Sequence, residues 1–384
     1  MSMHIVYAFE EAPTSYAKSI FLAGPTPRDE RTPSWRPKAL RILEESDYDG
    51  VVFVPEARDG KWRKDYDGQL EWEEKHLHLA DCILFWIPRE LTHMPAFTTN
   101  DEWGTWKYSG KCVFGAPADA PKTNYQRYYA KKLLVPNTET LEGTIMLALQ
   151  TLGDGAVRTN GEREVPIHIW RTSHFQSWYQ AQKNAGNRLD GAKVISVFRV
   201  GKKKEIVFLF VLHVNVFVSS ESRNKTNEVV VARPDISSIL LYHPGKTFNE
   251  TEVVLVREFR SPATTRDGNI WELPGGSASK PSMGPRENAV EELSEETGFH
   301  IDRSRLRIHA PRQLAGTLSS HKAHLFSAQI TKEELEWLHA RRGIMQGDPR
   351  HSERTFVEIK TVRDILNSPE PDWTTIGMIL SAIA

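Results

Sequence analysis

A run of glutamates between residues 287 and 296 is the strongest chemical signal in the sequence. Its members are Glu287, Glu291, Glu292, Glu295 and Glu296, with no Lys or Arg among them. Apolar residues recur within the run at helical spacing, and Gly298 stands where a helix commonly ends, so the segment is predicted to be one helix. Like charges four residues apart cost a few tenths of a kcal/mol each. A bound cation would offset that repulsion.

Three of these carboxylates, Glu292, Glu295 and Glu296, have the i, i+3, i+4 spacing that places side chains at one point on a helix. Mg²⁺ or Mn²⁺ is the cofactor expected there, because hard divalent ions prefer carboxylate oxygens. A strand ending at Gly275 and Gly276 precedes the helix, and a pair of glycines lets a phosphate chain approach the backbone closely. The alternative is that the glutamates form only a solvated helix face.

The second half of this stretch resembles the signature of the Nudix hydrolases. The matching residues are Glu292, Leu293, Glu295, Glu296, Gly298 and Phe299. The sequence departs from the signature at Glu291, which takes the place of the family's Arg, and at Gly276, which lies one residue too far upstream. The resemblance implies an α+β fold with a mixed sheet in an α/β/α sandwich, and it makes Glu292, Glu295 and Glu296 the catalytic metal ligands. It also implies hydrolysis of a nucleoside diphosphate linked to a second group, which yields two monophosphates.

The segments at residues 253–262 and 271–276 resemble the ADP-ribose pyrophosphatase branch of that family. This branch accepts nucleoside diphosphates joined to a sugar. Arg257 and Arg260 could clamp the diphosphate, since guanidinium groups suit phosphate oxygens, although two surface charges are the alternative.

The same resemblance implies further roles around the expected metal site. Glu272, Gly275 and Gly276 are expected to bind the substrate. Glu353, in the segment before a strand at 356–360, is the glutamate expected to assist the metal or the attacking water. Divalent ions would neutralise the diphosphate and lower the pKa of a bound water, and a further carboxylate could take the proton of that water.

Strands and helices alternate in the N-terminal region. Short apolar runs at 19–25, 51–55, 82–87 and 111–115 predict strands, and the segments between them predict helices. This order predicts a doubly wound parallel sheet, in which ligands bind beyond the carboxyl ends of the strands. Gly24 and Pro25 end the first run and are therefore candidate substrate-binding residues.

This region also resembles the nucleoside 2-deoxyribosyltransferase-like group over most of residues 19–150. The resemblance rests on Phe21–Pro25, Trp72-Glu73, Ala80-Asp81, Phe85-Trp86, Glu102-x-Gly104 and Gly110-Lys111. It implies that Glu102 is the catalytic nucleophile that attacks the anomeric carbon of a sugar, and that Glu73 or Asp81 contacts the base or the sugar. The alternatives are structural, with Glu102 favoured by a helix dipole and the other two as solvated surface acids.

Length, net charge, apolar runs and cysteine content limit how the chain can be organised. A length of 384 residues predicts two or three domains, with expected boundaries at 1–152 for the deoxyribosyltransferase-like domain, 153–187 for a linker and 188–384 for the Nudix domain. A net charge of -1 gives no reason to expect nucleic-acid binding. The longest apolar run, 206–218, is too short to span a membrane, and no signal peptide is expected. Cys82 and Cys112 fit a reducing cytosol, so the expected location is the cytoplasm.

Together these interpretations predict an enzyme of nucleotide metabolism whose substrate is a nucleotide or a nucleoside-diphosphate sugar. An N-terminal domain that strips nicotinamide from NAD would yield ADP-ribose, which the C-terminal domain could split. Two alternatives stay open, namely a nucleotide-binding sensor with one or both domains inactive, and a nucleoside deoxyribosyltransferase that exchanges bases. A homodimer is also left open.

Overall fold

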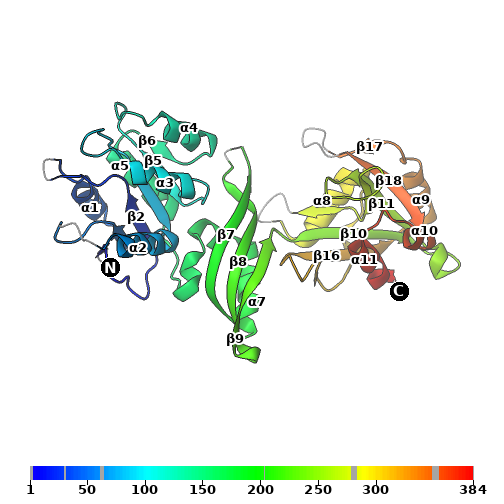
Figure 1. Ribbon diagram of the computed structural model, residues 1–384. Helices are drawn as coiled ribbons and strands as arrows, with labels where there is room; N and C mark the ends of the chain where they lie inside the picture. The colour runs from blue at the N-terminus through cyan, green and yellow to red at the C-terminus, as the bar shows by residue number, and fades with distance from the viewer. Residues whose placement is uncertain are drawn as a thin grey trace. The chain divides into compact units, whose positions relative to one another are not determined.

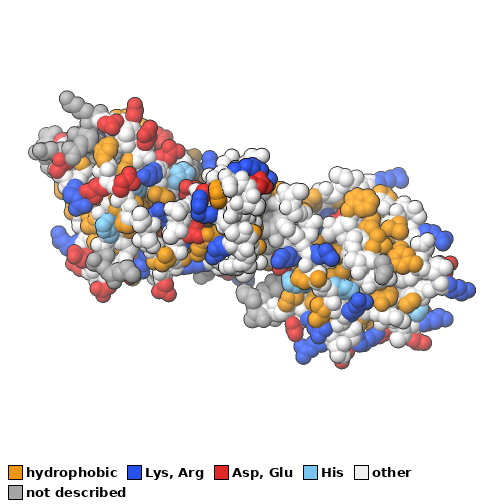
Figure 2. All heavy atoms as spheres, turned by 90° about the horizontal axis from the view of Figure 1, so that it is seen from below, with side chains coloured by type: hydrophobic (Ala, Val, Ile, Leu, Met, Phe, Trp, Pro, Cys, Tyr) orange, Lys and Arg blue, Asp and Glu red, His pale blue; other side chains and the backbone are white. Residues whose placement is uncertain are grey.

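The computed structural model describes residues 3–29, 32–60, 65–202, 204–277, 283–347 and 354–383. Two compact units, Met1–Val231 and Ala232–Ala384, make up the chain (Figure 1). Each unit has its own hydrophobic core. On the face drawn in Figure 2, Lys and Arg side chains are interspersed with Asp and Glu side chains, in keeping with the net charge of -1. Across the described ranges, no helix combines the length and the apolarity needed to cross a membrane.

A six-stranded parallel sheet is the centre of the first unit. In spatial order its strands are β1 (His4–Tyr7), β3 (Val51–Val54), β2 (Ser19–Ala23), β4 (Cys82–Trp86), β5 (Cys112–Gly115) and β6 (Asn137–Thr138). Every pairing is parallel. All residues of β2, β3, β4 and β5 are buried, because helices cover both faces of the sheet. The predicted doubly wound parallel sheet is confirmed.

Five helices form the two outer layers of this unit. They are α1 (Arg36–Glu45), α2 (Tyr66–Leu79), α3 (Phe97–Trp106), α4 (Asn124–Lys132) and α5 (Leu141–Leu152). Helices α1 and α5 pack on one face through Leu43 and Ile145, and α2 and α3 pack on the other through Trp72 and Trp103. Because α2 and α3 follow the strands β3 and β4, their N-terminal halves lie near the carboxyl ends of the parallel strands.

Residues 153–187, where a linker was expected, are mostly helical. They contain the 3-10 helix η1 (Asn160–Glu164), α6 (Ile167–Trp170) and α7 (Ser173–Asn184). A three-stranded sheet follows, made of β7 (Arg188–Val200), β8 (Ile206–Val218) and β9 (Arg223–Ala232). These strands were expected in the C-terminal domain, whereas their contacts group them with the first unit. There Phe175 of α7 packs on Phe210 of β8.

A nine-stranded mixed sheet forms the second unit. Its long strands are β16 (Lys322–Gln329), β10 (Ile236–His243), β11 (Glu252–Phe259) and β18 (Thr355–Thr361), in that spatial order. Its short strands are β12 (Asn269–Glu272), β13 (Gly275–Ser277), β14 (Arg307–Ile308), β15 (Arg312–Gln313) and β17 (Met345–Gln346). Strands β10 and β16 are parallel, while β11 runs antiparallel to both β10 and β18.

Helices cover both faces of the mixed sheet. On one face, α8 (Pro285–Thr297) and α9 (Lys332–His339) pack through Leu293 and Leu335. On the other, α10 (Val362–Asn367) and α11 (Trp373–Ile383) pack through Ile365 and Ile379. The predicted glutamate helix is α8, and Gly298 ends it in the left-handed conformation with φ 69°, as the sequence indicated.

Candidate functional site

A cavity of about 820 Å³ lies in the first unit. Its wall contains the residues that follow β2 and β3, the first half of α2 and the start of α3, which is where a parallel α/β sheet places a ligand. The charged residues that line it are Arg28, Asp29, Arg36, Glu56, Asp65, Glu73 and Glu102.

Glu102 reaches this cavity from the second turn of α3. Its carboxyl group has a pKa raised to about 8, mainly by burial and next by the Glu73 carboxylate, while the Arg36 guanidinium opposes the rise. The dipole of a helix acts mainly within the first turn, so it does not explain an acid at this position. A half-buried carboxyl group with a raised pKa in a cavity is typical of a reactive site.

Glu73 faces the same cavity from α2. Its carboxyl oxygen accepts a hydrogen bond of 2.6 Å from Gln69 Nε2. Burial raises the pKa of Glu73, while the bond from Gln69 and the charge of Arg36 partly oppose this. Two carboxyl groups that share a poorly hydrated site do not ionise together easily. The structure therefore brings two of the sequence-predicted site residues together.

Arg36 fixes the edge of the cavity, and the sequence analysis missed it. It is 1% exposed, and its Nη1 donates to Glu56 Oε1 at 2.6 Å and to Thr26 Oγ1 at 2.9 Å. Its Nη2 donates to Gly24 O at 2.7 Å and its Nε to Leu22 O at 3.1 Å. The sequence did contain a signal for Arg36, because it stands at the predicted start of a helix. The helix dipole disfavours a cation there unless the cation has other partners.

Gly24 and Pro25 both line the cavity, as expected. A Cβ atom on Gly24 would lie 2.2 Å from Trp86 O and 2.9 Å from the Trp35 ring, so only glycine fits. Pro25 O accepts a hydrogen bond of 3.1 Å from Trp35 Nε1. These contacts hold the turn after β2 against β4.

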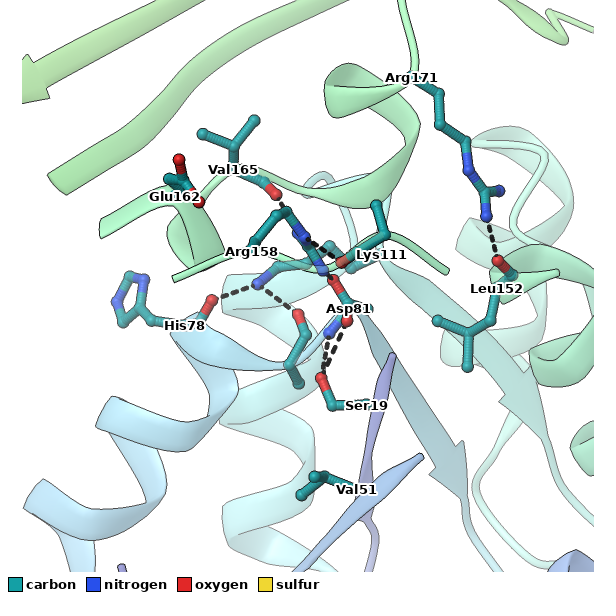
Figure 3. Close-up of polar contacts among 12 residues, drawn as sticks. Ser19, Val51, His78, Asp81, Lys111, Leu152, Arg158, Glu162, Val165 and Arg171 are labelled. Atoms are coloured by element: carbon teal, nitrogen blue, oxygen red, sulfur yellow. Dashed lines mark hydrogen bonds and ion pairs between the residues drawn. The ribbon is translucent and has the colours of Figure 1, made fainter. Parts of the chain in front are cut away.

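Asp81, an expected substrate-binding residue, lies elsewhere (Figure 3). It directly precedes β4 and so lies at the amino end of the sheet, whereas the cavity lies at the carboxyl end. Asp81 is 1% exposed, forms an ion pair with Arg158, and accepts a hydrogen bond of 3.1 Å from Ser19 Oγ. Arg158 in turn donates to Val165 O at 2.6 Å. We therefore correct the expectation: Asp81 holds the segment after α5 against the sheet.

Glu296 is the most buried carboxylate of α8 and lies 9% exposed in the second unit. Its Oε2 accepts a hydrogen bond of 2.9 Å from the Gly275 backbone N–H. Burial raises its pKa well above the usual range, and the charges of Glu292 and Glu258 add to that rise. The Gly275 N–H and the Arg260 guanidinium oppose it. Several acids thus face one buried point.

Gly275 and Gly276 belong to strand β13, which pairs with β10. A Cβ atom on Gly276 would lie 2.5 Å from Glu292 Oε1, and a Cβ atom on Gly275 would lie 2.2 Å from Ser237 O. The double glycine was expected to admit a phosphate. In this structure the absence of side chains at the two glycines leaves room for the Glu292 side chain and for the neighbouring strand β10.

Arg260 lies among the acids on the α8 side of the sheet. Its Nη2 is 2.8 Å from Glu272 Oε2 and 2.9 Å from Glu258 Oε2. Arg233 is near it, because the charge of Arg260 lowers the pKa of Arg233, after burial as the main cause. Arg233 also donates to Ser277 Oγ at 2.9 Å. The sequence analysis did not single out Arg233.

Arg257 does not join Arg260, so the expected pair of clamping arginines is corrected. Side chains alternate along a strand, and residues three apart point to opposite faces. Val254 packs in the core beneath α8, whereas Leu255 packs in the core beneath α11, which places Arg257 on the α11 side. There its Nε lies 3.7 Å from Glu358 Oε1, and its guanidinium lies over the Phe356 ring.

The acids of α8 fit a divalent cation only in part. Glu295 is exposed, and among the described residues no three His, Cys, Asp or Glu side chains converge to hold a metal ion. Glu353 lies outside the described residues. Glu292 and Glu296 are left as two neighbouring carboxylates, and Mg²⁺ is commonly held by one or two carboxylates together with water and substrate phosphates.

Comparison with known proteins agrees with this geometry. Residues 17–120 match the family described as "Nucleoside 2-deoxyribosyltransferase like", a range that contains β2 to β5, Glu73 and Glu102. A Bacillus subtilis (strain 168) protein named "Putative ADP-ribose pyrophosphatase YjhB" is 35% identical over 78 residues. That match covers 20% of this chain and 30% of the relative. Residues 17–120 are therefore similar to that family, and a fifth of the chain is similar to that relative.

Proposed function

We propose that the first unit cleaves the N-glycosidic bond of a nucleoside, with Glu102 as the nucleophile. The observation that carries this proposal is the position of Glu102 and Glu73 on one cavity, at the carboxyl ends of the strands and within the range that matches the family. Arg36 supports both groups, since its charge opposes the rise in the pKa of each.

In the first step the ionised Glu102 carboxylate attacks the anomeric carbon of the sugar. The bond from carbon to the base nitrogen breaks, its electron pair stays on the base, and a glycosyl ester forms on Glu102. Glu73 stays ionised beside Glu102, whose pKa its negative charge raises, and a neutral leaving base takes its proton from water. In the second step water or a second base attacks the same carbon, the ester bond breaks with its electron pair on Glu102, and the proton of the attacking group passes to Glu73. Water makes the protein a hydrolase, and a base makes it a transferase.

The test measures base release from a panel of nucleosides by the full-length protein. Release is expected from the wild-type protein, with a loss of at least about 100-fold in Glu102→Gln. Glu74→Gln is the matched control, because Glu74 lies on the same helix as Glu73 with a side chain that is 77% exposed. Adding a free base and looking for the exchanged nucleoside separates a transferase from a hydrolase. Equal release by wild type and Glu102→Gln would remove the proposal.

We propose a second activity for the second unit, hydrolysis of a diphosphate bond of the Nudix type. The observation that favours it is the buried Glu296 held by the Gly275 N–H beside Glu292. These two carboxylates would hold Mg²⁺ or Mn²⁺, which when bound supplies charge neutralisation and activation of water. Arg233 and Arg260 lie beside them and are suited to bind phosphate oxygens.

ADP-ribose with Mg²⁺ is the test substrate for this activity, with AMP and ribose 5-phosphate as the expected products. Glu296→Gln is expected to abolish turnover, whereas Glu287→Gln, at a position whose side chain is 50% exposed, is the control. Tight nucleotide binding without turnover in the wild-type protein would instead favour a sensor. Nicotinamide release from NAD, followed by AMP formation, would show that the two units act in series.

A further inference from the structure

Acidic residues outnumber basic residues among the described residues that line the cavity of the first unit. Among the described lining residues, the acids are Asp29, Glu56, Asp65, Glu73 and Glu102, and the bases are Arg28 and Arg36. Asp29 contacts His93 at 2.8 Å, and Asp65 accepts from the Gly68 N–H at the start of α2. Glu73 and Glu102 are the acids left on the inner wall.

Arg36 does not neutralise this inner pair by direct contact. Its N–H groups are donated to Glu56, to Thr26 and to two carbonyl oxygens. Within the described ranges, Glu73 has Gln69 as its hydrogen-bond partner, and no Lys, Arg or His forms an ion pair with Glu73 or Glu102. The two carboxyl groups therefore have no cationic hydrogen-bond partner. A cation bound near them would stabilise their ionised forms.

We propose that this cavity takes nucleosides whose base carries a positive charge, with Glu73 and Glu102 as the counter-charges. This inference rests on the proposed cleavage of an N-glycosidic bond and names its class of substrate. A cationic base also suits the chemistry. When its bond to the sugar breaks, the electron pair neutralises the base, so the base leaves without taking up a proton.

The charge of the base also explains how Glu102 becomes a nucleophile. The groups that act on it are Glu73 of α2, Asp101 of α3 and Arg36 of α1. With a pKa of about 8, only about one Glu102 in ten is ionised at pH 7 in the free protein. A cation a few ångströms away lowers the pKa of a carboxyl group. Binding of a cationic base therefore converts Glu102 to the reactive carboxylate, and a neutral base does not.

Aromatic side chains at the cavity favour the same class of ligand. Tyr66 at the start of α2 is 63% exposed and Phe97 at the start of α3 is 66% exposed, and both line the cavity. The Arg28 guanidinium already lies over the Phe97 ring, 5.4 Å from its centroid. Ring faces attract cations and stack on flat bases. They add affinity for a positively charged heterocycle.

The test compares adenosine with 1-methyladenosine, which differ by one methyl group and by one positive charge at pH 7. Binding to the full-length protein is measured by calorimetry in two buffers of different ionisation enthalpy, which reports proton release. We expect 1-methyladenosine to bind at least about 10-fold more tightly and to release close to one proton, as Glu102 ionises. Glu102→Gln should abolish the proton release, and Glu74→Gln should preserve it.

Two outcomes separate this inference from the function on which it rests. Equal affinity for both nucleosides, or tight binding without proton release, overturns the charge selection even if base release still depends on Glu102. Absence of base release from every nucleoside, including cationic nicotinamide riboside, overturns the proposed cleavage as well. Glu73→Gln gives an independent check, since it should weaken the binding of 1-methyladenosine at least about 5-fold more than the binding of adenosine.

Discussion

Glu73 and Glu102 come from different helices and face one cavity, and the Glu73 carboxylate is the second cause, after burial, of the raised pKa of Glu102. Each helix follows a strand of the parallel sheet, so the pair is set by the order of strands and helices. The two acids lie 29 positions apart in the sequence, and only the fold makes them neighbours.

The pH dependence of base release follows from this pair. Glu102 must be ionised to attack, so kcat/KM for a nucleoside is expected to rise with pH and to level off above about pH 8, the pKa of Glu102 in the free protein. Glu73→Gln removes a negative charge that raises this pKa, so the rise should move to lower pH. A pH profile that is identical in wild type and Glu73→Gln would contradict the coupling of the two groups.

Glu102→Gln is expected to stabilise the protein. The folded-state pKa of Glu102, about 8, lies above the ordinary value of 4.5, so ionisation lowers the free energy of unfolding as the pH rises from 4.5 through about 8. Glutamine does not ionise and avoids this loss, on the order of 5 kcal/mol at pH 9. Urea unfolding of wild type and Glu102→Gln at pH 5 and pH 9 measures this difference in the free energy of unfolding. An equal difference between variant and wild type at both pH values would argue against the raised pKa.

Asp81→Asn is expected to lower stability and to leave catalysis unchanged in the protein that remains folded. The substitution leaves Arg158 buried without its carboxylate, and breaking a buried ion pair in this way costs about 3–5 kcal/mol. Thermal unfolding reports the loss, and KM for a nucleoside reports the site. A raised KM with unchanged stability would return Asp81 to the substrate-binding residues.

Alanine at the two glycines of β13 should separate folding from function in the second unit. Gly275→Ala brings Cβ to 2.2 Å from the backbone oxygen of Ser237, so the pairing of β13 with β10 is expected to be lost at a cost of about 2 kcal/mol or more. Gly276→Ala meets only the end of the Glu292 side chain, which can move. It should therefore keep its melting temperature and lose the stabilisation that Mg²⁺ would give to the wild type if Glu292 and Glu296 bind it. The opposite ranking would contradict the placement of Glu292.

The parallel sheet could be predicted because its strands are short, continuously apolar runs between helices, which is typical of buried strands. Glu102 and Glu73 were predicted as site residues through the family resemblance, and both line the cavity. Asp81 was not. A residue directly before a parallel strand lies at the amino edge of the sheet, and that relationship was available from the sequence.

Other parts of the site depend on contacts that no local pattern reveals. Arg36 is defined by partners at Leu22, Gly24 and Glu56, which belong to other elements. Arg257 and Arg260 were paired from their spacing, although the alternation of a strand puts them on opposite faces. The strands β7 to β9 have a pattern that fits either unit, and only their packing assigns them to the first.

A trapped glycosyl ester tests the central claim most directly. The full-length protein is incubated with a nucleoside that carries fluorine at C2 of the sugar, which slows release of the ester, and is then digested for mass spectrometry. If Glu102 is the nucleophile, the peptide containing Glu102 gains the mass of the fluorosugar and Glu102→Gln gains none. Base release from this nucleoside with the adduct on a different residue, or undiminished in Glu102→Gln, would contradict it.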